Sequence, residues 1–344
     1  VALLFAGLGI QSSVAGVPYR QFQQIQQYQM IVSENLSATN QDKVNLEEVL
    51  KGQDIKAYQK IYSKTLDKDF KGKAGLQTIT LMMTEKEDLT PFIHLQNHQQ
   101  ELTLKDGVVI TAKLAQLAGV KVGQTLEIEG KKLKVTAITE NYVGHFIYMS
   151  QASYEQIYGQ LPQANTYLVS LRDTSATSIE RQAGLLMNQS AVSSVVQNAS
   201  AIRLFDSVAS SLNQTMTILV IVSVLLAIVI LYNLTNINVA ERIRELSTIK
   251  VLGFHNNEVT LYIYRETIVL SLVGIVLGLV SGFYLHQFLI QMISPATILF
   301  YPQVGWEVYV IPVAAVSIIL TLLGFFVNYH LRKVDMLEAL KSVE

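Results

Sequence analysis

The sequence contains no cysteine. This absence excludes disulfide frameworks, thiol nucleophiles and zinc sites built from cysteine. The sequence also lacks an excess of either charge: it has 26 lysine and arginine residues and 27 aspartate and glutamate residues, for a net charge of −1. This near-equal balance of charges gives no indication of nucleic-acid binding.

Motifs of catalysis are missing as well. No G-x-x-x-x-G-K-[ST] phosphate loop occurs, since residues 123–131 (GQTLEIEGK) have the wrong spacing and no serine or threonine after the lysine. Neither G-x-S-x-G nor H-E-x-x-H is present. His94 and His98 have a metal-ligand spacing, but a solvated pair is the better interpretation. We therefore expect that this chain is not an enzyme and binds no cofactor. Any ATP hydrolysis is expected in a separate subunit or in sequence beyond these residues.

Three long stretches carry no charged residue: 207–240, 267–293 and 308–328. A bilayer core of about 30 Å needs roughly 20 apolar residues in a helix. We predict transmembrane helices at about 214–236, 267–291 and 308–329; three buried helices of a soluble protein are the less favoured alternative. Because His286 is the only titratable imidazole inside a span, an ion channel or secondary transporter is disfavoured.

The first residues are apolar too, but residues 1–10 (VALLFAGLGI) are too short to span a membrane. We interpret residues 1–17 as the outer end of a first transmembrane helix that is truncated; a buried helix or strand is the alternative. The fold class predicted is thus a membrane protein with a four-helix transmembrane unit and an α+β extracytoplasmic domain between helices 1 and 2.

That α+β domain is predicted to cover residues 18–212. Strand patterns rich in β-branched and aromatic residues lie at 76–83, 107–111, 125–129, 133–139, 145–149 and 166–171, and helical patterns at 45–64, 111–117, 151–158 and 175–188. The lysine-rich block at about 40–73 is predicted to be an exposed helical insert. The glutamine-rich residues 21–29 (QFQQIQQYQ) are predicted to extend the first helix with a solvated face.

Orientation follows from loop charge. The connection 236–265 and the tail after the third span carry lysines and arginines, whereas the 294–307 loop carries none. By the positive-inside rule, the first connection and the C-terminus are cytoplasmic, in a plasma membrane, and the large domain is extracytoplasmic. Aromatic residues of the outer loop are expected at the outer interface: Tyr301, Trp306 and Tyr309.

Between the first two uncharged stretches lies a short charged cassette, ERIRELSTIKVLG, at residues 241–253. Its spacing predicts a cytoplasmic helix at 240–253 with one charged and one apolar face, ended by a glycine. A plain interfacial linker is the alternative. The candidate coupling residues are Glu241, Arg242, Arg244, Glu245, Leu246, Lys250 and Gly253.

Gly274, Gly278 and Gly282 recur every four residues in the second uncharged span. Small residues on one face let another membrane helix approach closely. We predict that they pack against a neighbouring span or a second copy of the chain; the high frequency of glycine in membrane helices is the alternative explanation.

Four segments resemble one family. The cassette, the glycine-repeat span, the closing residues 331–344 (LRKVDMLEALKSVE) and residues 3–16 are similar to FtsX-like permeases of ABC transporters, the group with MacB-type and lipoprotein-releasing permeases. Residues 106–128 are similar to that family's MacB-like periplasmic core. The resemblance implies an FtsX-like permease domain at 213–344.

The resemblance further implies a bacterial permease subunit, or the C-terminal half of a duplicated permease, in an efflux or mechanotransmission system. A separate ABC ATP-binding subunit would push on the cassette and move the outer domain. The other expected partners are a second permease copy or half, membrane lipid and an unidentified extracytoplasmic ligand. A regulator of a cell-wall hydrolase, or a sensor or scaffold without an ATPase, remains an alternative.

Overall fold

The computed structural model describes residues 1–72, 74–85, 89–97, 100–242, 245, 249, 256–300 and 304–333. The chain divides into two compact units. The helical unit comprises Val1–Ala15, Ser210–Ile293 and Pro302–Glu344, and the α/β unit comprises Gly16–Ala209 and Ser294–Tyr301. Each unit is described by itself.

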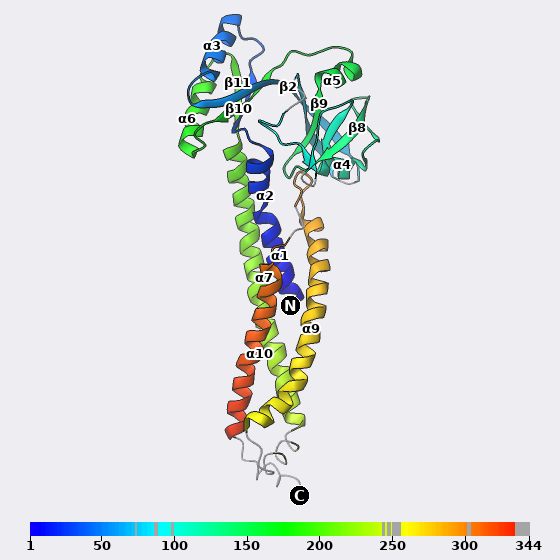
Figure 1. Cartoon of the computed structure of the whole chain (residues 1–344), viewed down its shortest axis with the longest axis vertical. Coiled ribbons are helices and arrows are strands. Elements are labelled where there is room, and N and C mark those ends of the chain that lie inside the picture. The colour runs from blue at the N-terminus through cyan, green and yellow to red at the C-terminus, as the bar shows by residue number, and fades with distance from the viewer. Residues whose placement is uncertain are drawn as a thin grey trace. The chain divides into compact units, whose positions relative to one another are not determined.

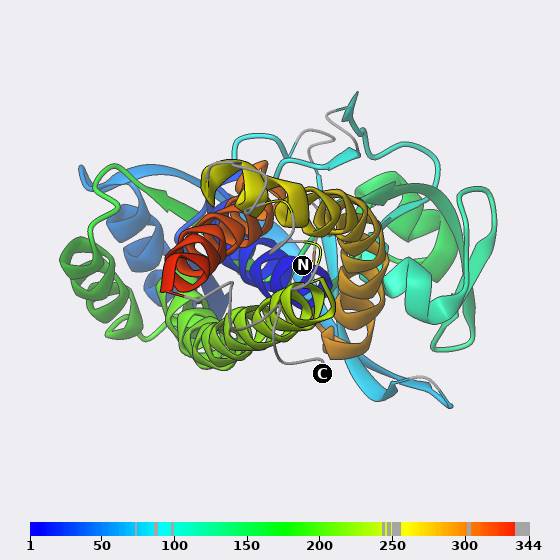
Figure 2. The ribbon, with the colours of Figure 1, turned by 90° about the horizontal axis from the view of Figure 1, so that it is seen from below.

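Long apolar helices form the helical unit (Figure 1): α1 (Ala2–Ala15), α7 (Asn198–Glu241, from Ser210 on), α9 (Asn256–Ile293) and α10 (Glu307–Lys333). Among the described residues, four helical stretches are long and apolar enough to cross a membrane: Ala2–Ile25, Asn198–Glu241, Tyr264–Ile293 and Glu307–Tyr329. The three predicted spans are therefore confirmed as apolar helices, each longer than its uncharged window. Figure 2 shows α1 among the other three helices.

The predicted extension of the first helix into the glutamine-rich residues is confirmed as far as Ile25. After α1, the short helix α2 (Val17–Tyr19) and a π-helical turn η1 (Arg20–Ile25) continue it to Gln26, where the backbone becomes extended. Gly16 and Pro18 stand at the break after α1. A proline lacks the N–H that a helix interior needs and is tolerated in the first turn of a helix, which is where Pro18 lies in α2.

One mixed nine-stranded sheet organises the α/β unit, in the order β11-β1-β10-β2-β3-β9-β6-β8-β7. Only the pairs β3–β9 and β6–β8 are parallel. The strands are β1 (Met30–Glu34), β2 (Ile55–Phe70), β3 (Gly75–Thr84), β6 (Val108–Thr111), β7 (Thr125–Ile128), β8 (Lys131–Thr139), β9 (His145–Ser150), β10 (Thr166–Leu171) and β11 (Val192–Gln197). The six predicted strands are all present. A separate hairpin joins β4 (Gln96–Asn97) to β5 (Gln100–Glu101).

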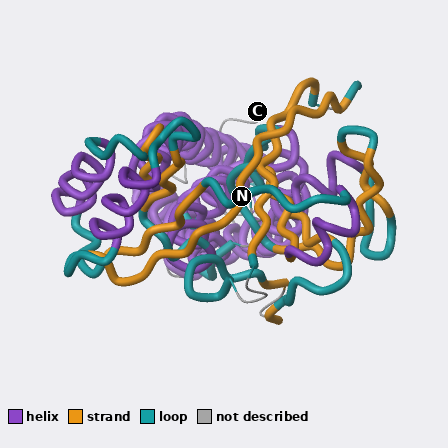
Figure 3. Tube along the Cα trace, turned by 90° about the horizontal axis from the view of Figure 1, so that it is seen from above, coloured by secondary structure: helices purple, strands orange, loops and turns teal. Residues whose placement is uncertain are grey.

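The sheet carries two hydrophobic cores. One lies around β3, β9, β6 and β8 with helices α4 (Ala112–Ala118) and α5 (Gln151–Tyr158). The other lies around β1, β10 and β11 with helices α3 (Asn40–Leu50) and α6 (Ala176–Met187). Strand β2 joins the two lobes, because its first part pairs with β10 and its second with β3. Figure 3 shows the strands running between these two groups of helices.

The predicted helical insert at 40–73 is wrong in its second half. Its first part is α3, whose N-terminus is closed by a capping box of Thr39 and Asp42. Residues 55–70, however, form strand β2. The lysines at 56, 60, 64 and 68 recur every four residues, a spacing that suits one face of a helix and equally one face of a strand. The β-branched and aromatic residues between them decide for the strand.

Candidate functional site

The charged cassette is described only in part. Glu241 ends α7, and Glu241, Arg242 and Glu245 are at least partly exposed. The other predicted coupling residues, Arg244, Leu246, Lys250 and Gly253, lie outside the described residues.

Arg242 has a partner within the helical unit. Its guanidinium donates a hydrogen bond to the carboxylate of Glu266 on α9. One turn earlier on α7, the amide of Asn238 donates to the hydroxyl of Thr267 at 3.2 Å. Because residues four apart share a helix face, these two contacts hold one side of α7 against α9. The Tyr264 hydroxyl then bonds the carbonyl of Leu320 on α10 at 3.1 Å.

The glycine series lies partly against α1. A Cβ atom on Gly282 would stand 2.8 Å from Cβ of Phe5, and one on Gly278 would stand 2.6 Å from Cβ of Val1. At Gly274, no atom of the described residues lies within 4 Å of the added Cβ atom. Close approach of the helices thus depends on two of the three glycines.

Two of the three predicted interface aromatics are described, and Tyr301 lies outside the described residues. Trp306 is 71% exposed. Tyr309 packs edge-on against Phe5 of α1, with ring centroids 5.0 Å apart. Both rings are exposed, and that of Tyr309 also contacts a ring of the first helix.

The α/β unit contains a polar junction centred on Gln21, which is fully buried. Its Nε2 donates to Oδ1 of Asn141 at 2.8 Å, and its Oε1 accepts the backbone N–H of Tyr142 at 2.7 Å. Asn141, only 1% exposed, donates in turn to the carbonyls of Val143 and Gly144. The expected solvated face is therefore wrong at Gln21. The turn between β8 and β9 is bonded to the segment that continues α1.

The loop after α9 joins the same turn. Leu299 N–H donates to the carbonyl of Tyr142 and Gly144 N–H to the carbonyl of Thr297, both at 2.8 Å, around an antiparallel bridge between Val143 and Ile298. We call residues Gln21, 141–144 and 294–300 the junction. Two segments are bonded there to one turn: η1, which follows α1 and α2 in the chain, and residues 294–300, which follow α9.

Beneath the loop lie two buried basic groups. Lys113 of α4, 8% exposed, donates from Nζ to Ser294 Oγ at 3.1 Å. His145, 2% exposed, has no hydrogen-bond partner at either ring nitrogen within the described part of the chain. Burial lowers the pKa of both groups, and the charge of Lys113 lowers that of His145 further. The surroundings of His145, next to the junction, therefore favour its neutral form.

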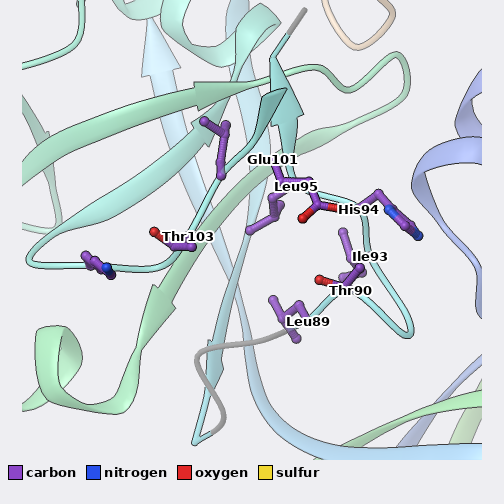
Figure 4. A pocket seen from close by; sticks show the side chains of 9 residues that line it. Leu89, Thr90, Ile93, His94, Leu95, Glu101 and Thr103 are labelled. Carbon is purple, nitrogen blue, oxygen red and sulfur yellow. The ribbon is translucent and has the colours of Figure 1, made fainter. Parts of the chain in front are cut away.

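A half-open cavity of about 420 Å³ lies elsewhere in the α/β unit (Figure 4). Its wall residues come from the chain around the β4–β5 hairpin: Leu89, Thr90, Ile93, His94, Leu95, Glu101, Leu102, Thr103 and Lys105. His94 lines it, while His98 lies outside the described residues. Among the residues that the structure describes, no cluster of histidine, aspartate and glutamate could hold a metal ion.

In the described part of the chain, four helices long and apolar enough to cross a membrane are joined to an α/β domain, which is the architecture of a membrane protein. Residues 217–336 match the family described as FtsX-like permease C-terminal. The chain is therefore similar to that family over these residues, and the predicted resemblance is confirmed there. No curated protein matches the chain.

Two solved structures are similar to the chain. The periplasmic region of MacB from Actinobacillus actinomycetemcomitans has a TM-score of 0.31 and 10% identity, covering 53% of this chain and 94% of that one. The extracellular domain of the noncanonic ABC-type transporter YknZ from Gram-positive bacteria has a TM-score of 0.29 and 14% identity, covering 49% of this chain and 98% of that one.

Proposed function

We propose that the chain is the permease subunit, or the C-terminal permease half, of an ABC-type efflux or mechanotransmission system in a bacterial plasma membrane. Its work is to convert ATP hydrolysis by a separate ATP-binding partner into movement of the α/β unit. The FtsX-like match over residues 217–336 supports the permease class. The apolar helices, without charged residues in their central stretches, support movement of rods rather than passage of ions.

In this proposal the α/β unit is extracytoplasmic and the cassette and C-terminus are cytoplasmic. Loop charge supports the orientation, since arginines and lysines lie in the 236–265 connection and in the C-terminal tail but not in the 294–307 loop. Two permease copies or halves act together around the partner, and lipid surrounds the spans.

The observation that carries the proposal is the junction. A spanning helix that shifts or tilts must pull on something rigid before its motion reaches another domain. The segment after α1 and the loop after α9 are both hydrogen-bonded to the 141–144 turn. Since Gln21 and Asn141 are buried and hydrogen-bonded to each other, a shift of the turn away from the segment after α1 would leave buried polar groups without partners. The junction is thus suited to pass a shift of the spans into the sheet through β8 and β9.

At the other end of the spans, we divide the cassette into two roles. Arg242 braces α7 against α9 through Glu266, so its charge serves the permease itself. Arg244 and Glu245 are left to contact the ATP-binding partner. Charge reversal of these two residues tests the division directly.

The test is purification of the tagged chain in detergent from the membranes of its own cell, with mass spectrometry to identify any ABC ATP-binding protein that co-purifies. We expect Arg244→Glu with Glu245→Arg to abolish association, because a rim of reversed charges repels the same surface. Lys132→Glu with Glu155→Lys, a reversal in the α/β unit, should leave association unchanged. Retention of the partner by the cassette variant contradicts the proposed contact. A chain that binds no ATPase at all contradicts the proposed function and favours a sensor or scaffold.

A further inference from the structure

The cavity beside the β4–β5 hairpin lies outside the junction and has no role in the proposed coupling. We propose that it binds an extended peptide segment that carries an apolar side chain between a cationic and an anionic group. Its volume of about 420 Å³ falls within the range of ordinary ligand sites.

The lining of the cavity suits a peptide better than a lipid chain or a simple anion. Leu89, Ile93 and Leu95 are buried residues whose side chains form an apolar wall. Glu101 and Lys105, both exposed, add charges of opposite sign. An acyl chain offers nothing to these charges, and a bare anion is repelled by Glu101. A peptide can present both signs and an apolar side chain together.

The backbone next to the cavity offers a further recognition element. In the described chain, no strand pairs with the outer edge of β5, whose residues Gln100 and Glu101 are exposed. The opposite edge of the hairpin is occupied, because Glu140 N–H donates to the carbonyl of Gln96 at 2.8 Å. An extended peptide can add to an open strand edge through main-chain hydrogen bonds and place alternate side chains in a pocket.

The wall of the cavity is hydrogen-bonded to residues 25–27, at the end of the helical segment that follows α1. Gln27 N–H donates to the carbonyl of Phe92 at 2.8 Å, and His94 N–H donates to the carbonyl of Ile25 at 2.9 Å. Gln26 and Ile93 form the bridge between these bonds. Ile25 lies four residues after Gln21 of the junction. A peptide in the cavity and a movement at the junction would thus act on the same short stretch of chain. This link between peptide and movement rests on the proposed function, whereas peptide binding does not.

Binding is tested with the full chain in lipid nanodiscs, without ATPase or nucleotide. The probe is an end-blocked pentapeptide, Lys-Leu-Ser-Leu-Glu, with photo-leucine at its second position, and a second probe has the lysine and glutamate exchanged. Illumination followed by mass spectrometry locates the adducts. We expect saturable labelling within residues 89–105 and a preference for one of the two probes. Glu101→Lys with Lys105→Glu should reverse that preference by about tenfold or more, since the rim charges exchange places.

Thr103→Trp fills the cavity from an exposed position and should abolish labelling without touching the core. The matched control, Lys132→Glu with Glu155→Lys, exchanges two exposed charges away from the cavity and should keep the wild-type preference. Labelling that ignores the charge exchange, or adducts only outside residues 89–105, overturns the proposal. So does a co-purifying phospholipid whose removal is required for labelling, because the cavity is then a lipid site. None of these results bears on association with the ATPase, so the two proposals fail separately.

Discussion

At the scale of single residues, Gln21 shows how one buried amide can fix a whole segment. It satisfies Asn141 and the backbone of Tyr142 at once. We expect Gln21→Leu to lower the free energy of unfolding of the α/β unit by about 1–3 kcal/mol, because it leaves buried polar groups without partners. Thermal unfolding of the full chain in detergent measures the change.

Gln24 provides the control for that prediction. It lies in the same glutamine-rich turn but is exposed. Gln24→Leu should change the free energy of unfolding by about 0.5 kcal/mol or less. If both variants are equally mild, the Gln21 bonds do not hold the junction together.

His145 gives the α/β unit a pH dependence of definite sign. Because its folded pKa is lowered by burial and by Lys113, the unfolded chain takes up the proton first as pH falls. Stability is therefore constant above the ordinary histidine pKa of about 6.5 and is lost below it, by about 1.4 kcal/mol for each unit of pKa lowering.

His145→Phe should remove this loss. A phenyl ring has similar size, and neither ring nitrogen of His145 has a partner to lose in the described structure. Melting curves at pH 7.5 and pH 5 measure the difference, with His94→Phe at the half-exposed cavity wall as the control. An equal acid sensitivity in wild type and His145→Phe contradicts the assignment to this histidine.

At the scale of elements, the close approach of α1 and α9 depends on particular glycines. We expect Gly282→Ala to destabilise the helical unit by about 1–3 kcal/mol, since its new methyl group meets Cβ of Phe5, which cannot rotate away. Thermal unfolding in detergent again measures this. Gly274→Ala, with open space around it, should be neutral or stabilising because alanine favours a helix by up to about 1 kcal/mol. Equal effects at the two positions contradict packing by the glycine face.

Elements with one dominant period could be predicted from the sequence. Uncharged windows locate α7, α9 and α10, and strand-like runs locate β3 and β6 to β10, because burial imposes the pattern locally. Strand β2 could not be predicted in this way, since its four-residue lysine spacing satisfies two periods. The glycine series predicts a packing face but not its partner helix.

The candidate site was harder to predict than the fold. Burial of Gln21 depends on Asn141, 120 residues away in sequence, and no local pattern records a contact of that range. The only local signal was an apolar spacing of Phe22, Ile25 and Tyr28 in the same stretch, which predicts one packed face. Pairing of Arg242 with Glu266 likewise needs the two helices side by side.

At the scale of the whole molecule, the loop after α9 decides whether span movement reaches the sheet. Leu299→Pro removes the N–H that bonds Tyr142, whereas Leu299→Ala keeps it. Under the proposed function, we expect the proline variant to keep its partner's ATP hydrolysis and to lose the nucleotide-dependent movement of the α/β unit. The alanine variant should keep both.

Absence of cysteine makes this measurable, because spin labels attach only where cysteines are introduced. Leu36 and Val122 are exposed, and lie beside the α3 and α4 lobes respectively. Labels there report the distance between the lobes by pulsed electron resonance, with and without ATP in the presence of the partner. Because β2 is the long strand shared by both lobes, a pull on the β8–β9 turn should change their separation only while the loop is docked. If Leu299→Pro leaves the ATP-dependent change in label distance intact, the loop after α9 does not carry the movement, and it enters through η1 and Gln21 alone. The double variant Leu299→Pro with Gln21→Leu should then lose that change in distance.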